Sequence, residues 1–217
     1  MKVGILFDLD GTLLDTLEDL YDAVNYTLRH FGCPERTLEE VRCFVGNGAV
    51  NLLRRALPGN PGDPSPEEAF DVFRTYYNAH CQEMTRPYPG ILQALAALQE
   101  FPTAIVSNKP EDAVVLLSRQ YFGNMVALGD VPDCRRKPAV DNILRAMSTL
   151  GVDHCILVGD SEVDVLTAQN AGVPCLSVTW GFRDQKTLEQ AGATHFCHDP
   201  AQLPAILNEM VGKLHVQ

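Results

Sequence analysis

The sequence predicts an α/β fold, a doubly wound parallel sheet with an inserted all-helical cap domain. Short apolar strands alternate with amphipathic helices along most of the chain, which is the pattern of a parallel sheet covered by helices. Residues 15–86 break this rhythm, because they show helical periodicity without a convincing strand. We therefore expect a core formed by residues 1–14 and 87–217 and a helical cap formed by residues 15–86.

The predicted core begins with the strand Lys2–Phe7, a mainly apolar run that ends abruptly at polar residues. Four further segments have the same character: Thr103–Ser107, Met125–Leu128, Cys155–Gly159 and Cys175–Thr179. Core helices are expected at 91–100, 111–120, 140–150 and 163–171, where apolar residues recur on one face. Gly151 and Gly172 follow the last two helices, as C-terminal capping residues commonly do.

The predicted cap contains helical patterns at Leu17–Phe31, Leu38–Val45, Ala49–Ala56 and Glu67–Met84. A loop rich in Pro and Gly, from Pro58 to Pro66, separates the last two patterns. The chain is expected to return to the core near Tyr88–Gly90, where turn-forming residues precede the next core helix.

Composition restricts the partners of this chain. The formal net charge of −11 disfavours binding to nucleic acid or to an anionic membrane, and no apolar run is long enough to span a bilayer. The apolar N-terminal run is too short for a signal peptide. The 7 cysteines contain no CxxC pair and are odd in number, which indicates reduced thiols in a cytoplasmic protein. We expect a monomer or a homodimer with a small-molecule partner.

Polar residues follow three of the predicted strands. Asp8 and Asp10 come after the first strand, Ser107 and Asn108 end or follow the second, and Asp160 follows the fourth. Ligands of open α/β sheets bind beyond the carboxyl ends of the strands, so we expect these side chains to converge at one edge.

The acidic residues of this edge predict a divalent cation. Asp164 lies one helical turn beyond Asp160 and faces the same way if that segment opens a helix. Several adjacent carboxylates repel one another, and a hard cation with oxygen ligands, such as Mg²⁺, relieves the repulsion. One carboxylate can then serve as a nucleophile toward phosphorus and a second as acid and base, roles that suit Asp8 and Asp10.

The remaining polar residues suit the binding of a phosphoryl group. Ser107 and Asn108 supply hydrogen-bond donors, and Lys137 supplies a positive charge for the phosphoryl oxygens.

Four segments carry a family resemblance: Asp8–Thr12, Ser107-Asn108, Lys137-Pro138 and Gly159–Asp164. Their order and spacing resemble the phosphatase branch of the haloacid dehalogenase superfamily over essentially the whole chain. The resemblance implies a Rossmann-like core with a cap, and a reaction through an aspartyl-phosphate.

The same resemblance implies a role for each residue of these segments. Asp8 would be the nucleophile and Asp10 the acid and base. Asp8, the main-chain carbonyl of Asp10 and Asp160 would bind Mg²⁺, with Asp164 acting directly or through water. The residues implied to bind or orient the phosphoryl group are Thr12, Ser107, Asn108 and Lys137.

Within the superfamily the chain most resembles phosphoglycolate phosphatases, through Val45–Gly48, Tyr88–Gly90 and Thr179–Phe182. This implies hydrolysis of 2-phosphoglycolate to glycolate and phosphate. The cap turn Gly46, Asn47 and Gly48 is then a candidate for contacting substrate or closing the cap.

Alternatives remain open at this stage. Phosphoryl transfer between sugar positions, as in hexose-phosphate mutases, would use the same catalytic set, and a nucleotide, pyrophosphate or sugar phosphate could replace phosphoglycolate. Dehalogenases need neither the second carboxylate nor a metal, and phosphonate hydrolases use a cap lysine, which residues 15–86 lack. A non-catalytic binding protein is disfavoured because every catalytic position is filled.

Overall fold

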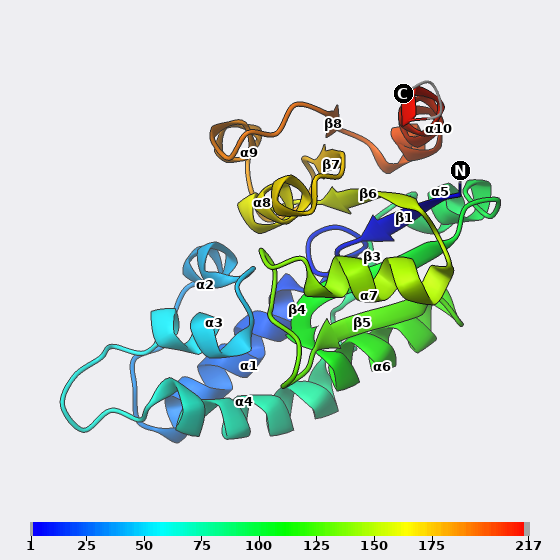
Figure 1. Ribbon diagram of the computed structural model, residues 1–217. Coiled ribbons are helices and arrows are strands. Elements are labelled where there is room, and N and C mark those ends of the chain that lie inside the picture. Colours follow the sequence, from blue (N-terminus) through cyan, green and yellow to red (C-terminus); the bar gives the residue numbers. More distant parts are fainter. Residues whose placement is uncertain (1, 215–217) are drawn as a thin grey trace.

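Residues 2–214, which the computed structural model describes, form a parallel sheet flanked by helices and a separate group of helices (Figure 1). The sheet has six strands in the order β5-β4-β1-β6-β7-β8. Their bounds are β1 (Val3–Phe7), β4 (Thr103–Pro110), β5 (Val126–Asp130), β6 (His154–Gly159), β7 (Cys175–Val178) and β8 (Phe196–Cys197). The predicted α/β fold with an inserted helical cap is confirmed.

Helices cover both faces of the sheet. Along β1, Val3, Ile5 and Phe7 pack into one apolar cluster and Leu6 into another, as the two-residue period of a strand requires. The first cluster is covered by α5 (Ile91–Ala97), α6 (Glu111–Phe122) and α10 (Leu203–Leu214), and the second by α7 (Asp141–Leu150) and α8 (Glu162–Ala171). Burial on both faces explains why β1 is apolar throughout.

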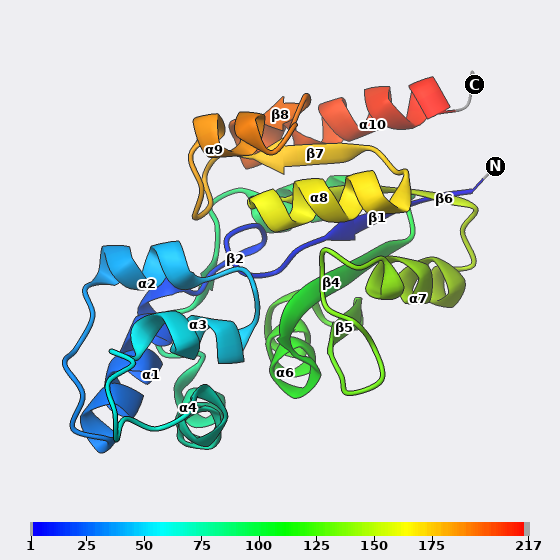
Figure 2. The same cartoon turned by 60° about the vertical axis from the view of Figure 1, so that its left-hand side comes forward.

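The cap consists of α1 (Leu17–His30), α2 (Leu38–Phe44), α3 (Ala49–Ala56) and α4 (Pro66–His80). These helices lie beside the end of the sheet at which β1 and β4 finish (Figures 1 and 2). Local sequence sets two of their starts. Thr37 with Glu40 and Ser65 with Glu68 form capping boxes at α2 and α4, and Pro66 occupies the first turn of α4.

Two short strands connect cap and core. β2 (Leu14–Asp15) pairs antiparallel with β3 (Arg86–Pro87), so the chain leaves and returns at adjacent points. The helix α4 ends at His80, earlier than the predicted Met84. The buried Asp19 carboxylate accepts hydrogen bonds from the backbone N–H groups of Met84 and Thr85 at 2.8 and 2.9 Å, which turns the chain toward β3. The division into domains at 15 and 86 stays a prediction.

The last strand of the sheet, β8, was not predicted from the sequence. Strand β8 has 2 residues, too few for a visible period, and pairs with β7. The short helix α9 (Gln185–Gln190), the 3₁₀ turn at Pro200–Gln202 and α10 were not expected either. Strand β4 extends beyond the predicted Ser107 to Pro110, so Ser107 and Asn108 belong to its carboxyl end.

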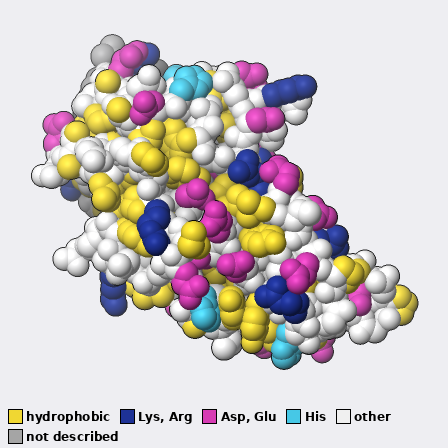
Figure 3. Space-filling model, turned by 180° about the vertical axis from the view of Figure 1, so that it is seen from behind, with side chains coloured by type: hydrophobic (Ala, Val, Ile, Leu, Met, Phe, Trp, Pro, Cys, Tyr) yellow, Lys and Arg dark blue, Asp and Glu magenta, His cyan; other side chains and the backbone are white. Residues whose placement is uncertain are grey.

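The surface carries the negative charge predicted from composition. On the face shown in Figure 3, Asp and Glu side chains gather near the middle, with Lys and Arg side chains scattered around them. In residues 2–214 no helix combines the length and the apolar character that a membrane crossing requires.

Candidate active site

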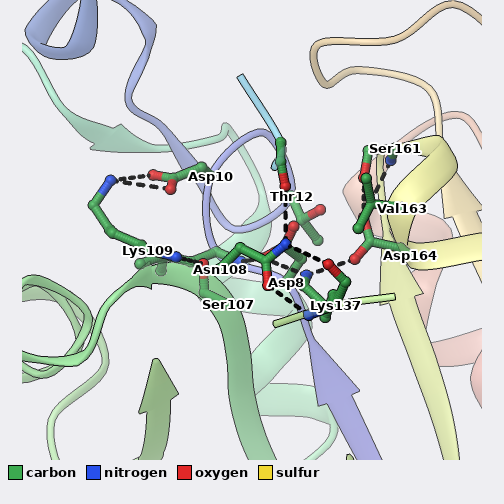
Figure 4. Close-up of polar contacts among 12 residues, drawn as sticks. Asp8, Asp10, Thr12, Ser107, Asn108, Lys109, Lys137, Ser161, Val163 and Asp164 are labelled. Atoms are coloured by element: carbon green, nitrogen blue, oxygen red, sulfur yellow. Dashed lines mark hydrogen bonds and ion pairs between the residues drawn. The ribbon is translucent and has the colours of Figure 1, made fainter. Parts of the chain in front are cut away.

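The carboxyl end of β1 places Asp8 at the centre of the site. The Asp8 backbone N–H continues the sheet by donating to the Val158 carbonyl at 2.8 Å. The Asp8 carboxylate is buried, and its Oδ1 accepts a hydrogen bond from the Leu9 backbone at 2.7 Å. The same oxygen lies 3.0 Å from Nζ of Lys137. The predicted nucleophile and the predicted phosphate-binding lysine are thus brought into direct contact (Figure 4).

Lys137 also reaches the carboxylate of Asp164. Its Nζ lies 2.6 Å from Asp164 Oδ1, and both side chains are buried. The other oxygen of Asp164 accepts from the backbone and hydroxyl of Ser161 at 3.2 and 2.6 Å, where α8 begins. Lys137 therefore holds a positive charge between two buried carboxylates. Burial lowers the pKa of Lys137, but the attraction of Asp164 and Asp8 raises it by more than burial lowers it. The ammonium therefore stays charged.

Asp160 is held from both sides. Its Oδ1 accepts from the Thr12 hydroxyl at 3.0 Å, and its Oδ2 accepts from the Phe182 backbone at 2.8 Å. A Cβ atom at Gly11 or at Gly181 would overlap the Asp160 side chain, and Gly11 has a φ of 83°. Both glycines are therefore required for the β1 loop and the loop after β7 to close around this carboxylate.

Three buried carboxylates form the candidate metal site. Oxygens of Asp8, Asp160 and Asp164 lie within 4.8 Å of one another. Burial, followed by repulsion from Asp164, raises the pKa of Asp8 to about 8 and that of Asp160 to about 7. An all-oxygen set of buried, mutually repelling carboxylates fits a hard divalent cation such as Mg²⁺. The side chain of Asp10 is not part of this group.

These pKa shifts predict that metal-free protein loses stability as pH rises from about 4 to about 8. In this window Asp8 and Asp160 bind protons in the folded chain, whereas in the unfolded chain they ionise near 3.8. Raising the pH therefore favours the unfolded state. Mg²⁺ should oppose this loss increasingly, by about 2.7 kcal/mol at 100 times its Kd, which is roughly 5–10 °C for a chain of this size.

Thermal unfolding in EDTA and in Mg²⁺, measured from pH 5 to 8, checks this expectation. Asp160→Asn is the matched variant, because it removes one titrating carboxylate at constant size and should flatten the pH dependence in EDTA. A wild-type midpoint in EDTA that rises through the window relative to the variant would contradict the assignment.

Asp10 points away from the carboxylate group, toward a lysine that the sequence did not single out (Figure 4). Nζ of Lys109 lies 2.8 and 3.0 Å from the two carboxylate oxygens of Asp10, and the Thr16 hydroxyl donates to Oδ1 at 2.7 Å. Lys109 is buried in β4 immediately after Asn108. Lys109 directly follows a predicted site residue near the end of a strand, and this position could have identified it as a site residue from the sequence.

Ser107 and Asn108 occupy the predicted edge. The Ser107 hydroxyl accepts from the Lys109 backbone at 3.3 Å. The Asn108 amide donates to the Lys137 carbonyl at 2.9 Å and to the Gly46 carbonyl of the cap at 3.1 Å, while its oxygen accepts from the Lys137 backbone at 2.7 Å. Asn108 thus joins three separate segments of the chain.

Arg183 is a second link between core and cap that the sequence did not reveal. It follows Phe182 in the loop after β7, and its Nε pairs with Glu162 at 2.9 Å. Its guanidinium donates to the carbonyls of Arg42 at 3.0 Å and Val45 at 2.6 Å, at the C-terminal end of α2. A cation at this end also interacts favourably with the helix dipole.

A cavity between cap and core contains the candidate site. From the core it is lined by Asp8, Asp10, Ser107, Asn108, Lys109, Asp160, Ser161, Phe182 and Arg183. Its cap side is mainly apolar, with Leu20, Leu52, Phe70, Phe73 and Tyr77. Gly46 and Gly48 of the predicted cap turn line the cavity, whereas Asn47 is not among the lining residues and accepts from Asn51 through its carbonyl.

Comparison with known proteins identifies the family of this arrangement. The family of haloacid dehalogenase-like hydrolases matches residues 5–178. A phosphoglycolate phosphatase of Pseudomonas fluorescens is 35% identical over 92% of this chain and 77% of its own length. One from Agrobacterium fabrum is 35% identical over 96% of this chain and 94% of its own.

Solved structures share the fold. A protein of Lactobacillus delbrueckii subsp. bulgaricus, assigned as a phosphoglycolate phosphatase, has a TM-score of 0.84 and 34% identity over 94% of this chain and 97% of its own. A haloacid dehalogenase-like family hydrolase of Streptococcus pneumoniae has a TM-score of 0.84 and 26% identity over 95% of this chain and 98% of its own.

Proposed function

The chain belongs to the haloacid dehalogenase-like hydrolases, and from this premise we propose that it is a magnesium-dependent phosphatase acting on a small phosphate monoester. The best candidate substrate is 2-phosphoglycolate. The observation that carries the proposal is the contact of Asp8 with a buried cation, Lys137, inside a group of three carboxylates. Relatives named phosphoglycolate phosphatase at 35% identity support the substrate.

In the first step a carboxylate oxygen of Asp8 attacks phosphorus, and the bond from phosphorus to the leaving oxygen breaks. Asp10 donates a proton to that oxygen, so glycolate leaves as the alcohol. In the second step water attacks the phosphorus of the aspartyl-phosphate, Asp10 takes the proton of this water, and the bond from phosphorus to Asp8 breaks. Free phosphate leaves, Asp8 is again a free carboxylate, and Asp10 again carries the proton that it gave to the leaving oxygen.

Side chains around Asp8 hold the phosphoryl group. We assign this role to the Lys137 ammonium, which contacts Asp8, and to the Ser107 hydroxyl, which lines the same cavity. Asn108 orients these groups, because its side-chain amide already donates to the carbonyls of Lys137 and Gly46. Thr12 acts through Asp160, since its hydroxyl donates to that carboxylate.

Mg²⁺ would be held by Asp8, Asp160 and the main-chain carbonyl of Asp10, and would offset the negative charge of carboxylates and phosphate. Asp164 would contribute through water, because both of its oxygens already accept hydrogen bonds from Ser161 and Lys137.

Phosphate release from a panel of esters tests the function. The panel contains 2-phosphoglycolate, glucose 1-phosphate, a nucleotide and pyrophosphate, each with Mg²⁺ and with EDTA. We expect the highest kcat/KM for phosphoglycolate and no turnover in EDTA. A higher value for another ester would change the substrate, and conversion of glucose 1-phosphate to glucose 6-phosphate would make the enzyme a mutase.

Arg183 is expected to hold the cap closed over this substrate. Replacing it with Met removes the hydrogen bonds to the α2 carbonyls, so KM should rise about tenfold, the effect of roughly 1.4 kcal/mol. Steady-state kinetics measure this rise.

Arg54→Met is the matched control, because Arg54 pairs with Glu67 on the exposed cap surface and does not line the cavity. An unchanged KM in Arg183→Met would show that the cap closes without this contact.

A further inference from the structure

Lys109 is a buried cation that the reaction described above does not use. Its side chain is only 4% exposed and contacts both oxygens of Asp10. On its cap side the ammonium lies 4.5 Å from the centre of the Tyr77 ring in α4, within cation–π distance. Burying an ammonium is unfavourable unless a counter-charge accompanies it, and Asp10 supplies that charge here.

Asp10 cannot remain in this position and also protonate the leaving oxygen. Its carboxylate points toward Lys109 and away from Asp8, where the phosphoryl group must sit (Figure 4). When Asp10 turns toward the leaving oxygen, the Lys109 ammonium loses its counter-charge while it stays buried beside the Tyr77 ring. Another anion therefore has to take the place of Asp10.

The described part of the protein offers no substitute within the cavity. The other acidic residues that line the cavity are Asp8 and Asp160. Asp8 pairs with Lys137. Asp160 accepts hydrogen bonds from the Thr12 hydroxyl and the Phe182 backbone N–H. The substrate is the remaining source of negative charge. A carboxylate one methylene away from the leaving oxygen would lie next to the group that protonates this oxygen, which is where Lys109 is found.

We propose that Lys109 binds a carboxylate on the leaving-group half of the substrate and thereby frees Asp10, which takes a proton from solvent and passes it to the leaving oxygen. The proposal rests on the proposed phosphatase function and narrows its substrates to phosphate esters whose leaving group carries a carboxylate. It makes Lys109 a specificity residue: an ester without the carboxylate leaves Asp10 bound to Lys109 and reacts slowly.

The other cations of the cavity are poorer candidates for this role. The guanidinium of Arg183 is occupied by Glu162 and by cap carbonyls. The Arg74 side chain is 51% exposed and lies 3.5 Å from Asp71. Lys109 is the buried one, and a charge contact away from water discriminates more strongly between a charged and a neutral ligand.

The test compares kcat/KM for 2-phosphoglycolate and for ethyl phosphate, which has the same carbon count and no carboxylate. Wild type should prefer phosphoglycolate. In Lys109→Met this preference should fall about 10- to 100-fold, the effect of losing a hydrogen bond to a charged group. Ethyl phosphate turnover should rise, because Asp10 is no longer bound to Lys109. Lys109→Arg, which keeps the charge, should retain part of the preference.

Several results would overturn the proposal. Equal kcat/KM of the wild type for 2-phosphoglycolate and ethyl phosphate would overturn it, whether or not the Lys109→Met variant folds. Equal losses for both esters in Lys109→Met would make Lys109 only a support for Asp10, and loss of the preference in Arg74→Met would place the carboxylate elsewhere. Activity on a third ester, p-nitrophenyl phosphate, distinguishes failure of the proposed phosphatase function from failure of the proposed role of Lys109. Wild type inactive on all three esters refutes the proposed function and this inference together, whereas activity without the preference refutes this inference alone.

Discussion

Asp8→Asn is expected to reduce turnover by about 10⁴-fold or more, because the amide cannot form the bond to phosphorus. The fold should persist, and without metal the variant should be at least as stable as wild type. The substitution removes a buried carboxylate whose pKa is raised to about 8 by burial and by repulsion from Asp164. Steady-state phosphate release and thermal unfolding in EDTA measure the two effects.

A second observable ties the loss to the covalent step. Wild type quenched in acid during turnover should carry a phosphoryl adduct detectable by intact-protein mass spectrometry, and Asp8→Asn should carry none. Asp22→Asn, on the exposed surface of α1, is the matched control and should behave like wild type. Full activity of Asp8→Asn would refute the assignment of Asp8 as nucleophile.

Lys137→Met is expected to have the largest effect on stability. The ammonium is shared by the buried carboxylates of Asp8 and Asp164, and its removal leaves both without a counter-charge. Removing one partner of a buried ion pair costs about 3–5 kcal/mol, so unfolding in EDTA at pH 8 should occur roughly 10 °C lower than in wild type. Activity should be lost as well, because the phosphoryl group loses its contact with the lysine.

The pH dependence distinguishes this electrostatic cause from a packing defect. At pH 5 the Asp8 carboxyl is largely protonated in the metal-free protein, so the penalty of Lys137→Met should shrink there. Arg135→Met is the neighbouring control, since the Arg135 side chain is 78% exposed and pairs with Asp141, away from the buried carboxylates. A penalty that is equal at pH 5 and pH 8 would indicate lost packing in place of lost charge.

The sequence by itself determined the sheet and the edge at which the acidic residues meet. Burial on both faces makes β1 apolar throughout, and a sharp change to polar residues marks its end at Asp8, so local pattern was sufficient. Short elements could not be predicted from local pattern. Strand β8 has 2 residues and is a strand because β7 supplies its hydrogen bonds.

Only the tertiary structure decided which charges are paired. Lys109 and Asp10 are 99 positions apart, and Arg183 and Val45 are 138 apart, so no local period connects them. The sequence identified Lys137 as the cation of the site, but it showed neither that this ammonium is shared by Asp8 and Asp164 nor that a second buried lysine holds Asp10. Charge pairing depends on distance and burial, and both arise only when the cap and the strand ends are packed together.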